Sequence, residues 1–477
     1  MLLLERAERA GLWDRLIAIL EDYVAGVHRL RVTPELDPQR LRDLLAPYDF
    51  HEPVPALEAL DFAAAGLRRF QVHTPHPRYF GLYNPAPTTM GIAADTLVAA
   101  FNPQLAAWSH SPFAAEVERH VIRQIGARFG YNPASTDGTF ASGGAEANHT
   151  AVLAALAAGQ PDFLDKGVRA LPAQPVFYAS AECHHSFHKA ARLCGIGLDA
   201  LRLVPVDGEL RLDAFRLEQL IAADRRAGLL PFMIAGTAGS TNSGAVDPLP
   251  ALAEIARRER LWFHVDAAWG GAAVLSDSLR PLMAGIEQAD SITFDAHKWL
   301  SAPMGAGIFL TRHPDILLRS FRTPSAYMPK EAAGLDVVDP HLHSMQWSRR
   351  FIGLKVFLSL AVAGWKGYAE AVDHMAAMGG LLCHELRQDG WRIENSTPLP
   401  VVCFSGPDGL DLQAVVGELI ASGEAWVSST ALGGSRRVIR ACITNYRTAP
   451  EDVLALVASL ARARARALAA AVAPTAG

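Results

Sequence analysis

The segment SITFDAHKWL, residues 291–300, carries a lysine just after an apolar stretch that is typical of a buried strand. A buried ammonium group is costly unless it is paired with an opposite charge or used chemically. Lysine is nevertheless mostly exposed in proteins, and Lys298 could extend its stem over apolar neighbours toward solvent. Lys298 is therefore either an ordinary surface side chain or a reactive amine, and the rest of the chain has to decide.

A turn of small residues in FASGGAEANHTAVLAA, residues 140–155, opens a predicted helix. Small side chains at Gly144 and Ala145 leave backbone N–H groups bare at the helix N-terminus, where the helix dipole favours an anion. The turn matches neither the dinucleotide-binding pattern nor a P-loop. It is either an ordinary capped turn or a phosphate site.

A carboxylate near the end of a predicted buried strand needs a positive partner. Asp266 occupies this place in HVDAAWGGAA, residues 264–273. An arginine would make a structural ion pair, whereas the protonated ring nitrogen of a cofactor would make a functional one. Ala268 shares its face of the strand, and such a small side chain leaves room for a flat ring.

Three histidines stand in the segment ECHHSFHKAARLCG, residues 182–195: His184, His185 and His188. We expect no bound metal, because no convergent carboxylates or cysteines show the usual zinc spacing. An imidazole stacked on a planar ligand is the functional interpretation, and a satisfied histidine in a strand-to-helix turn is the structural one.

These groups together match the needs of one cofactor, pyridoxal phosphate. The phosphate turn would hold the phosphate, and Asp266 would keep the pyridine nitrogen protonated, so that the ring can accept electrons from a breaking bond. The amine of Lys298 would form the Schiff base. The combination favours a chemical role for Lys298.

Short runs that are apolar throughout alternate with helical segments between about residues 115 and 315, which is typical of a largely parallel sheet covered on both faces. The expected strands are 175–180, 231–240, 261–268, 291–296 and 305–312. Ligands bind beyond the carboxyl ends of such strands, so Thr237, Asp266, His184 and Lys298 should face one crevice. Residues 1–70 are expected to be helical, and a smaller unit follows residue 360, with strands at 391–395, 401–405 and 438–444.

Composition limits the partners and the location. The 477 residues are 50% hydrophobic with a net charge of −5, and no basic cluster indicates nucleic-acid binding. No apolar run approaches the roughly 20 residues that span a bilayer, and the charged N-terminal stretch indicates an amphipathic helix rather than a signal peptide. Five scattered cysteines without a CxxC pair fit a reducing compartment, so we expect a cytoplasmic protein.

The motifs SGGAEA, GTAGST, HVDAAWGG and DAHKWL, in this order, resemble the group II pyridoxal-phosphate-dependent amino-acid decarboxylases. The resemblance covers roughly residues 70–450. It implies an α/β protein of pyridoxal-phosphate fold type I, like aspartate aminotransferase, with a mostly parallel central sheet in a large domain and a smaller C-terminal α+β domain. It also implies a homodimer with the active site at the interface. The expected units are a helical dimerisation segment (1–75), a cofactor-binding domain (76–360) and a small domain (361–477).

Roles follow from the resemblance at the matching motif positions. Lys298 matches the Schiff-base lysine and Asp266 the carboxylate on the ring nitrogen. His184 matches the stacked histidine, with the adjacent His185 as its competitor. The remaining positions implied to bind cofactor or substrate are Gly144, Ala145, Thr237, Ala268 and His297 for the cofactor, and Tyr79, Phe80 and Arg440 for the substrate. Two positions depart from the aromatic-amino-acid members: Asp295 replaces asparagine, and Ala106 replaces a bulky aromatic residue.

The implied reaction is decarboxylation of an L-amino acid to an amine and CO₂, with aromatic amino acids among the candidates. Alternatives are an aromatic aldehyde synthase, or another lyase or aminotransferase of the same fold; a non-catalytic homologue is disfavoured because Lys298, Asp266 and the phosphate turn are all present. The loop 322–346 carries Tyr327. The decarboxylases that the chain resembles carry a tyrosine in this loop, whereas aldehyde synthases carry phenylalanine, so Tyr327 is the expected proton donor.

Overall fold

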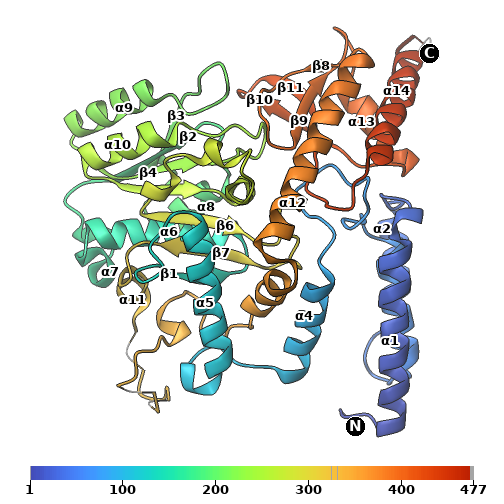
Figure 1. Ribbon diagram of the computed structural model, residues 1–477, viewed down its shortest axis with the longest axis horizontal. Helices are drawn as coiled ribbons and strands as arrows, with labels where there is room; N and C mark the ends of the chain where they lie inside the picture. Colours follow the sequence, from blue (N-terminus) through green and yellow to red (C-terminus); the bar gives the residue numbers. More distant parts are fainter. Residues whose placement is uncertain (1, 324, 330, 333, 473–477) are drawn as a thin grey trace.

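The computed structural model describes residues 2–323, 325–329, 331–332 and 334–472, and its strands form two separate sheets. Figure 1 shows the larger sheet on the left, the smaller one at the upper right and helix α12 (Gly353–Gln388) running between them. This agrees with the expected α/β architecture, a mostly parallel large sheet and a smaller C-terminal unit.

The large sheet has seven strands in the order β1-β7-β6-β5-β4-β2-β3. Their bounds are β1 (Asp137–Ala141), β2 (Pro175–Ser180), β3 (Leu201–Val204), β4 (Leu230–Thr237), β5 (Trp262–Asp266), β6 (Ser291–Asp295) and β7 (Gly307–Thr311). The five strands from β6 to β3 pair in parallel, whereas β7 runs antiparallel to both of its neighbours. All five predicted segments are strands, while the edge strands β1 and β3 were not predicted.

Helices cover both faces of this sheet, which explains why every residue of β2, β5, β6 and β7 is buried. One face packs against α12 and three further helices: α5 (Pro112–Arg128), α9 (Ala214–Arg226) and α10 (Leu249–Glu259). The other face packs against α6 (Gly144–Gly159), α7 (Asp162–Lys166), α8 (Ser186–Leu193) and α11 (Ile316–Phe321).

The small sheet is antiparallel, in the order β10-β11-β9-β8. Its elements are β8 (Arg392–Ile393), β9 (Val401–Ser405), α13 (Leu412–Ser422), β10 (Ser428–Leu432), β11 (Arg436–Cys442) and α14 (Pro450–Val472). Alternate residues of β9 point to opposite faces. Val401 and Cys403 join the core of the large sheet, whereas Val402 and Phe404 pack with α13 and α14. Strand β9 is therefore buried on both faces.

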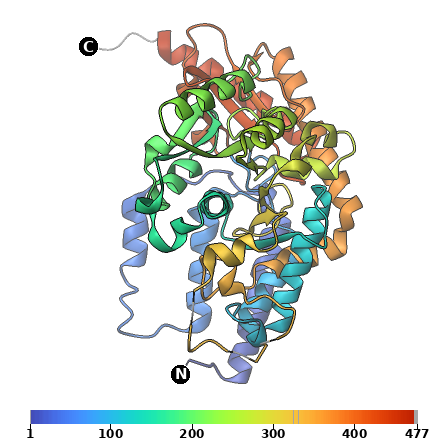
Figure 2. The ribbon, with the colours of Figure 1, turned by 90° about the vertical axis from the view of Figure 1, so that its left-hand side faces the viewer.

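The N-terminal region is helical, as expected, with α1 (Arg6–Gly26), α2 (Pro38–Leu45), α3 (Ala56–Arg69) and α4 (Thr89–Phe101). In Figure 1, α1 lies on the opposite side of the molecule from α9 and α10, and in Figure 2 it begins near the bottom of the molecule while α14 lies near the top. Helix α1 packs on α3, yet the side chains of Trp13 and Ile17 are 53% and 61% exposed. Within the described residues, we find no helix that is both long and apolar enough to cross a membrane.

Helix α12 passes through the expected boundary at residue 360 without ending. It bends instead at Gly364, whose backbone is left-handed with φ 63° and ψ 172°. Glycine adopts this conformation without the steric cost that other residues meet. The bend lies four residues after the expected boundary, and the domain limits themselves stay predictions.

One close backbone contact fixes where helix α6 begins. Gly307, at the start of β7, faces Gly143, the residue before α6. A Cβ atom at residue 307 would lie 2.6 Å from the Cα and carbonyl carbon of Gly143. Only glycine lets the strand and the turn approach this closely, and the contact sets the depth of the turn relative to the sheet.

Candidate active site

The carboxyl ends of three neighbouring parallel strands bring the predicted site residues together. Strand β4 ends at Thr237, β5 at Asp266 and β6 at Asp295. Thr237 and Asp266 are direct partners in the sheet register. Lys298 follows β6 in a tight turn in which its N–H donates to the carbonyl of Asp295. The predicted residues therefore lie together at the edge of the sheet where ligands bind in such folds.

The amine of Lys298 is paired rather than free. Its Nζ lies 2.9 Å from Oδ2 of Asp295, whose side chain is 2% exposed, while the lysine side chain is 22% exposed. The other oxygen of Asp295 is buried and finds no hydrogen-bond partner among the described residues. The turn is also strained, because Ser301 has a φ of 56° and donates its N–H to the carbonyl of Lys298. This pairing rejects the ordinary surface interpretation of Lys298.

The small-residue turn before α6 lies directly beside this pair. A Cβ atom at Gly144 would be 2.9 Å from Oδ2 of Asp295 and 3.4 Å from Cβ of Ala268. Ala145 is exposed, so its N–H side is open to the crevice. Glu146 accepts hydrogen bonds from both the N–H and the hydroxyl of Ser142, at 2.8 Å each, which leaves the groups at Gly144 and Ala145 for an anion.

Asp266 is 5% exposed and has only neutral partners. Its Oδ2 accepts a hydrogen bond from Nδ2 of Asn148 at 2.8 Å, and its Oδ1 accepts one from the N–H of Ala268 at 3.1 Å. No ion pair to Asp266 is found in the described part of the chain, so the arginine partner considered above is not there. The hydroxyl of its strand neighbour Thr237 is buried and has no partner among these residues. Both groups thus await a ligand.

His184 belongs to this cluster and His185 does not. Nδ1 of His184 lies 2.8 Å from Oγ of Ser186, which is 2.9 Å from Nδ2 of Asn148, the residue that holds Asp266. The ring of His185 instead lies 5.5 Å from that of His188. Burial lowers the pKa of His184 below the ordinary histidine value, so the ring is neutral near pH 7. This favours His184 as the stacking imidazole.

His297 lies on the phosphate side of the site. Its side chain is 6% exposed, and Nδ1 accepts a hydrogen bond from the N–H of Ala306 at 3.3 Å. A Cβ atom at Gly143 would lie 3.7 Å from the ring. Burial lowers the pKa of His297, so this imidazole too is neutral near pH 7.

The expected substrate residues have different surroundings. Arg440 is buried, and its guanidinium donates to Thr241 O, Gly81 O and Ser428 Oγ, with no acidic partner in the described chain. Tyr79 stacks on Trp426 with ring centroids 5.1 Å apart. Phe80 is fully buried in the core beneath α13 and α14. This placement gives Phe80 a packing role rather than an open substrate surface.

Tyr327 is 77% exposed, and its ring lies 5.9 Å from that of Trp347. Within the described residues, we find no hydrogen bond or ring contact that joins Tyr327 to the Lys298 cluster. Residues 324, 330 and 333 of the loop 322–346 lie outside the described residues. The structure therefore does not bring Tyr327 to the site of the same chain in this conformation.

Comparison with known proteins identifies the family. A family model for the pyridoxal-dependent decarboxylase conserved domain matches residues 38–406. The chain belongs to the pyridoxal-dependent decarboxylase family. It is 33% identical over 338 residues to the cysteine sulfinic acid decarboxylase of Mus musculus, covering 70% of this chain and 68% of that protein. It is 29% identical over 473 residues to the aromatic-L-amino-acid decarboxylase of Bacillus atrophaeus, covering 95% of each.

Solved structures agree on the fold. The crystal structure of mouse CSAD matches with a TM-score of 0.88 at 27% identity, covering 95% of this chain and 98% of that one. The structure of Oryza sativa TDC with PLP and tryptamine matches with a TM-score of 0.90 at 24% identity, covering 97% and 99%. The expected family, fold type I and cofactor are confirmed, and the protein is a pyridoxal-phosphate-dependent carboxy-lyase.

The site of this pyridoxal-dependent decarboxylase fits its cofactor, pyridoxal 5′-phosphate. Asp266 offers an unneutralised carboxylate, Thr237 an unpartnered hydroxyl and Lys298 an amine, and the bare turn at Gly144 would hold the phosphate. Ala268 adds no bulk near Asp266 that would fill the space for a ring. Each group that the cofactor needs is present, although individual roles stay predictions.

Three residues of the site were not predicted from the sequence: Asn148, Ser186 and His264. Asn148 lies on α6 four residues after Gly144, one helical turn further along the same face, and this spacing could have indicated it. His264 is two residues before Asp266 and fully buried, and its Nε2 lies 3.1 Å from Oδ1 of Asn148. Only the folded contacts reveal that these three side chains connect.

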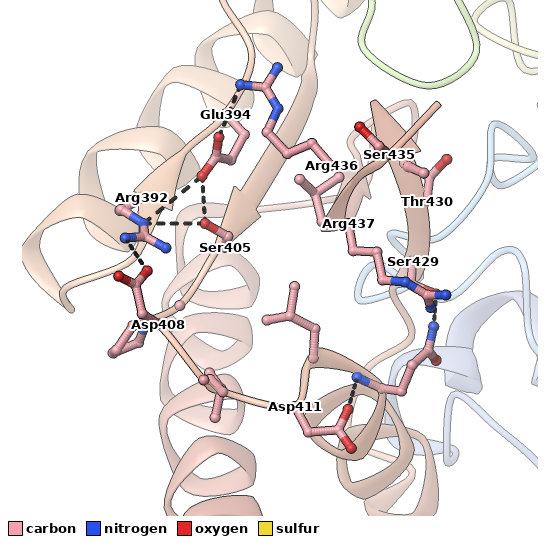
Figure 3. Close-up of a pocket in the computed structure, with 18 of the residues that line it drawn as sticks. Arg392, Glu394, Ser405, Asp408, Asp411, Ser429, Thr430, Ser435, Arg436 and Arg437 are labelled. Carbon is pink, nitrogen blue, oxygen red and sulfur yellow. Dashed lines mark hydrogen bonds and ion pairs between the residues drawn. The ribbon is translucent and has the colours of Figure 1, made fainter. Parts of the chain in front are cut away.

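A separate groove of about 990 Å³ lies on the small domain, between β10, β11 and the loop before α13 (Figure 3). Its charges are largely paired. Arg392 lies 2.8 Å from Asp408, and Arg436 lies 3.3 Å from Glu394. None of the predicted cofactor or substrate residues lines it, so it is not the decarboxylase site.

Replacing Asp266 with alanine should weaken cofactor binding and lower turnover. The change removes the counter-charge of the ring nitrogen, and breaking a buried charge pair typically costs about 3–5 kcal/mol. Cofactor affinity can be measured by titrating the visible absorbance of the bound cofactor, and turnover by CO₂ release.

Asp224→Ala is the matched control. Asp224 is also a buried carboxylate, and it pairs with Arg202 at a distance of 2.7 Å, outside the Lys298 cluster. This substitution should lower thermal stability while leaving cofactor affinity unchanged. Wild-type cofactor affinity and turnover in Asp266→Ala would show that the carboxylate serves the fold alone.

Proposed function

We propose that the protein decarboxylates an L-amino acid to the corresponding amine and CO₂, and that its substrates are aromatic. The observation that carries the proposal is the buried guanidinium of Arg440, which has no acidic partner in the described chain and lies beside the ring of Tyr83. Its Cζ lies 5.7 Å from the ring of Tyr83, and Tyr83 stacks on Trp269. Such a cation fits a carboxylate, and the buried rings beside it make the surroundings apolar, which disfavours a second charge on the substrate side chain.

The names of relatives bear on the substrate class in two ways. The relative aligned over 95% of this chain is named for aromatic amino acids, whereas the two relatives at 32–33% identity from Mus musculus are named for cysteine sulfinate and acidic amino acids. The apolar surroundings of Arg440 favour the first group for this chain, and acidic amino acids are the alternative that the assay must separate.

Each residue has a defined task in the proposed reaction. When bound, pyridoxal phosphate supplies a ring that accepts the electron pair left at the α-carbon as CO₂ departs. Lys298 provides the amine that holds the cofactor, and Asp266 keeps a proton on the ring nitrogen. Arg440 would hold the substrate carboxylate, and His184 would cover the ring. A proton donor must then deliver a proton to the α-carbon to give the amine.

A panel of L-amino acids tests the substrate proposal. Tyrosine, tryptophan and phenylalanine should release CO₂ and yield the matching amines, identified by mass spectrometry, because the apolar rings near Arg440 favour an uncharged side chain. Glutamate, aspartate and cysteine sulfinate should react at least roughly tenfold more slowly in kcat/KM, which corresponds to about 1.4 kcal/mol of discrimination. Lys298→Ala is the inactive control, and preferred turnover of the acidic substrates would reject the aromatic proposal.

The proposed proton donor is the phenol of Tyr327, which could act only after its loop moves or in the site of a second subunit. The exposed position of Tyr327 against Trp347 is also the observation that favours the second candidate, an aldehyde synthase. Without a donor near the α-carbon, the reaction with oxygen would lead to an aldehyde, ammonia and peroxide.

Tyr327→Phe separates these candidates, because it keeps the ring against Trp347 and removes only the hydroxyl. CO₂ release and cofactor absorbance should persist, while the product shifts from amine to aldehyde with peroxide formation. General acids of this kind typically contribute about 10²–10⁴-fold, so amine formation should fall at least a hundredfold. Trp347→Phe is a control for loop packing. An unchanged amine rate in Tyr327→Phe would exclude this tyrosine as the donor.

We also propose that the protein is a cytoplasmic homodimer whose N-terminal helices pack on the partner. The exposed apolar side chains of Trp13 and Ile17 on α1 support the dimer. The five free cysteines support a reducing compartment. An obligate dimer usually buries a large apolar interface.

Sedimentation analysis should therefore show a dimer for the wild type. Ile17→Glu should shift it toward monomer and lower activity, because a charge would enter the apolar contact. Glu21→Gln, a change at an exposed position of the same helix, should leave the dimer intact. A fully active wild-type monomer would contradict the proposal.

A further inference from the structure

The side-chain amide of Asn148 has one possible orientation. Its Nδ2 lies 2.8 Å from Oδ2 of Asp266 and 2.9 Å from Oγ of Ser186, and its Oδ1 lies 3.1 Å from Nε2 of His264. A carboxylate at the ring-nitrogen position only accepts hydrogen bonds, so the NH₂ group must face Asp266. The amide oxygen therefore accepts a hydrogen bond from Nε2–H of His264.

The opposite end of the same network is compatible with this direction. The indole N–H of Trp262 can only donate, and it lies 2.9 Å from Oγ of Ser291. The proton of the Ser291 hydroxyl is then free to point at Nδ1 of His264, 2.8 Å away. Burial lowers the pKa of His264 to about 4, so the ring is neutral near pH 7. Because Nε2 faces the amide oxygen of Asn148, which can only accept, the single proton of the ring is on Nε2. That proton faces the oxygen of Asn148, with Thr293 Oγ1 as a weaker neighbour at 3.4 Å.

The network leaves the core through Ser186. Oγ of Ser186 accepts a hydrogen bond from Asn148, and its own proton is free to point at Nδ1 of His184, 2.8 Å away. The backbone N–H of Ser186 also donates to this nitrogen, at 3.2 Å. Nδ1 of His184 thus accepts two hydrogen bonds and cannot carry a proton. In the neutral ring, the proton must be on Nε2, for which no partner is found in the described part of the chain.

We propose that Trp262, Ser291, His264, Asn148 and Ser186 form a hydrogen-bond relay of fixed direction that holds His184 as the Nε2–H tautomer. His184 would then present a donor, not an acceptor, to an oxygen atom of the bound amino acid. The same amide of Asn148 holds Asp266, so the relay positions the carboxylate and the imidazole together. The five relay members are positioning residues, and the inference rests on the proposed function only for the identity of the ligand.

The tautomer can be measured without altering the relay. Cofactor-loaded protein labelled with ¹⁵N-histidine would be studied by long-range ¹H–¹⁵N correlation, with His184→Gln to assign the signals. A neutral His184 with its proton on Nε2 supports the relay. A proton on Nδ1, or a charged ring at neutral pH, would overturn it.

Two substitutions of His264 separate a relay from mere packing. His264→Gln keeps one acceptor and one donor, so the direction of the hydrogen bonds can persist, whereas His264→Phe fills similar space and carries neither. His264→Phe should move a measurable fraction of His184 to the Nδ1–H tautomer. It should also lower kcat/KM by roughly tenfold or more, as expected when a buried polar partner is removed. His264→Gln should stay within about threefold of wild type, and equal effects of both variants on the tautomer would contradict the relay.

Two further variants complete the design. Thr293→Val removes a neighbour of His264 that is outside the relay, and the His184 tautomer should not change. Ser186→Ala cuts the relay next to His184. In this background, adding His264→Phe should not change the tautomer of His184 further. The tautomer is read independently of turnover. An inactive protein with Nε2–H would refute the proposed function alone, and an active decarboxylase with Nδ1–H would refute the relay alone.

Discussion

The carboxylate of Asp266 is buried at the end of β5 with two neutral hydrogen-bond donors and no cation in the described chain. A buried charge in this state is unfavourable, and the protonated ring of the cofactor would relieve it. Much of the surrounding structure serves this one charge. Asn148 orients the carboxylate from the side of α6, and the small side chain of Ala268 supplies both a backbone donor and space. If the cofactor ring binds Asp266, cofactor binding and folding are linked through this charge, since a ligand that binds only the folded state stabilises it.

Lys298 and Asp266 lie in the same site because they follow or end neighbouring strands, and we find no ion pair between them in the described part of the chain. Strands β5 and β6 are parallel neighbours, so Asp266 and Asp295 lie at the same edge of the sheet, and only Asp295 has a cationic partner among the described residues. Asp295 pairs with Lys298 of its own chain, whereas Asp266 is left for a ligand. The difference arises because Lys298 lies three residues after Asp295 in the same tight turn. Two buried carboxylates at one sheet edge are thereby kept from competing for one ammonium group.

Much of the fold could be predicted because its strands are apolar on both faces. Strands β2 and β4–β7 stand out for this reason, whereas β1 and β3 lie at the sheet edges. In β3 a polar residue, Arg202, interrupts the pattern, because it pairs with Asp224 on α9. Lys298, Asp266 and Thr237 were predictable because parallel strands place their ends together. The contacts of Asn148, Ser186 and His264 depend on how α6 and α8 pack on the sheet, which no local pattern encodes. The burial of Phe80 and the exposure of Tyr327 likewise follow from tertiary packing.

Strand β7 runs antiparallel to both of its neighbours, β1 and β6. Its first residue, Gly307, touches the turn that begins α6. Gly307 carries no functional group, yet any side chain there would push the turn away from the sheet edge. In a saturation mutagenesis map, this position should therefore accept glycine alone and score as intolerant as the lysine. An enzyme engineer who chose library positions by their distance from a docked substrate would treat Gly307 as free to vary. Tolerance to substitution at this position should depend on the backbone contact that sets the depth of the turn before α6. The shape of the substrate cavity would not reveal that dependence.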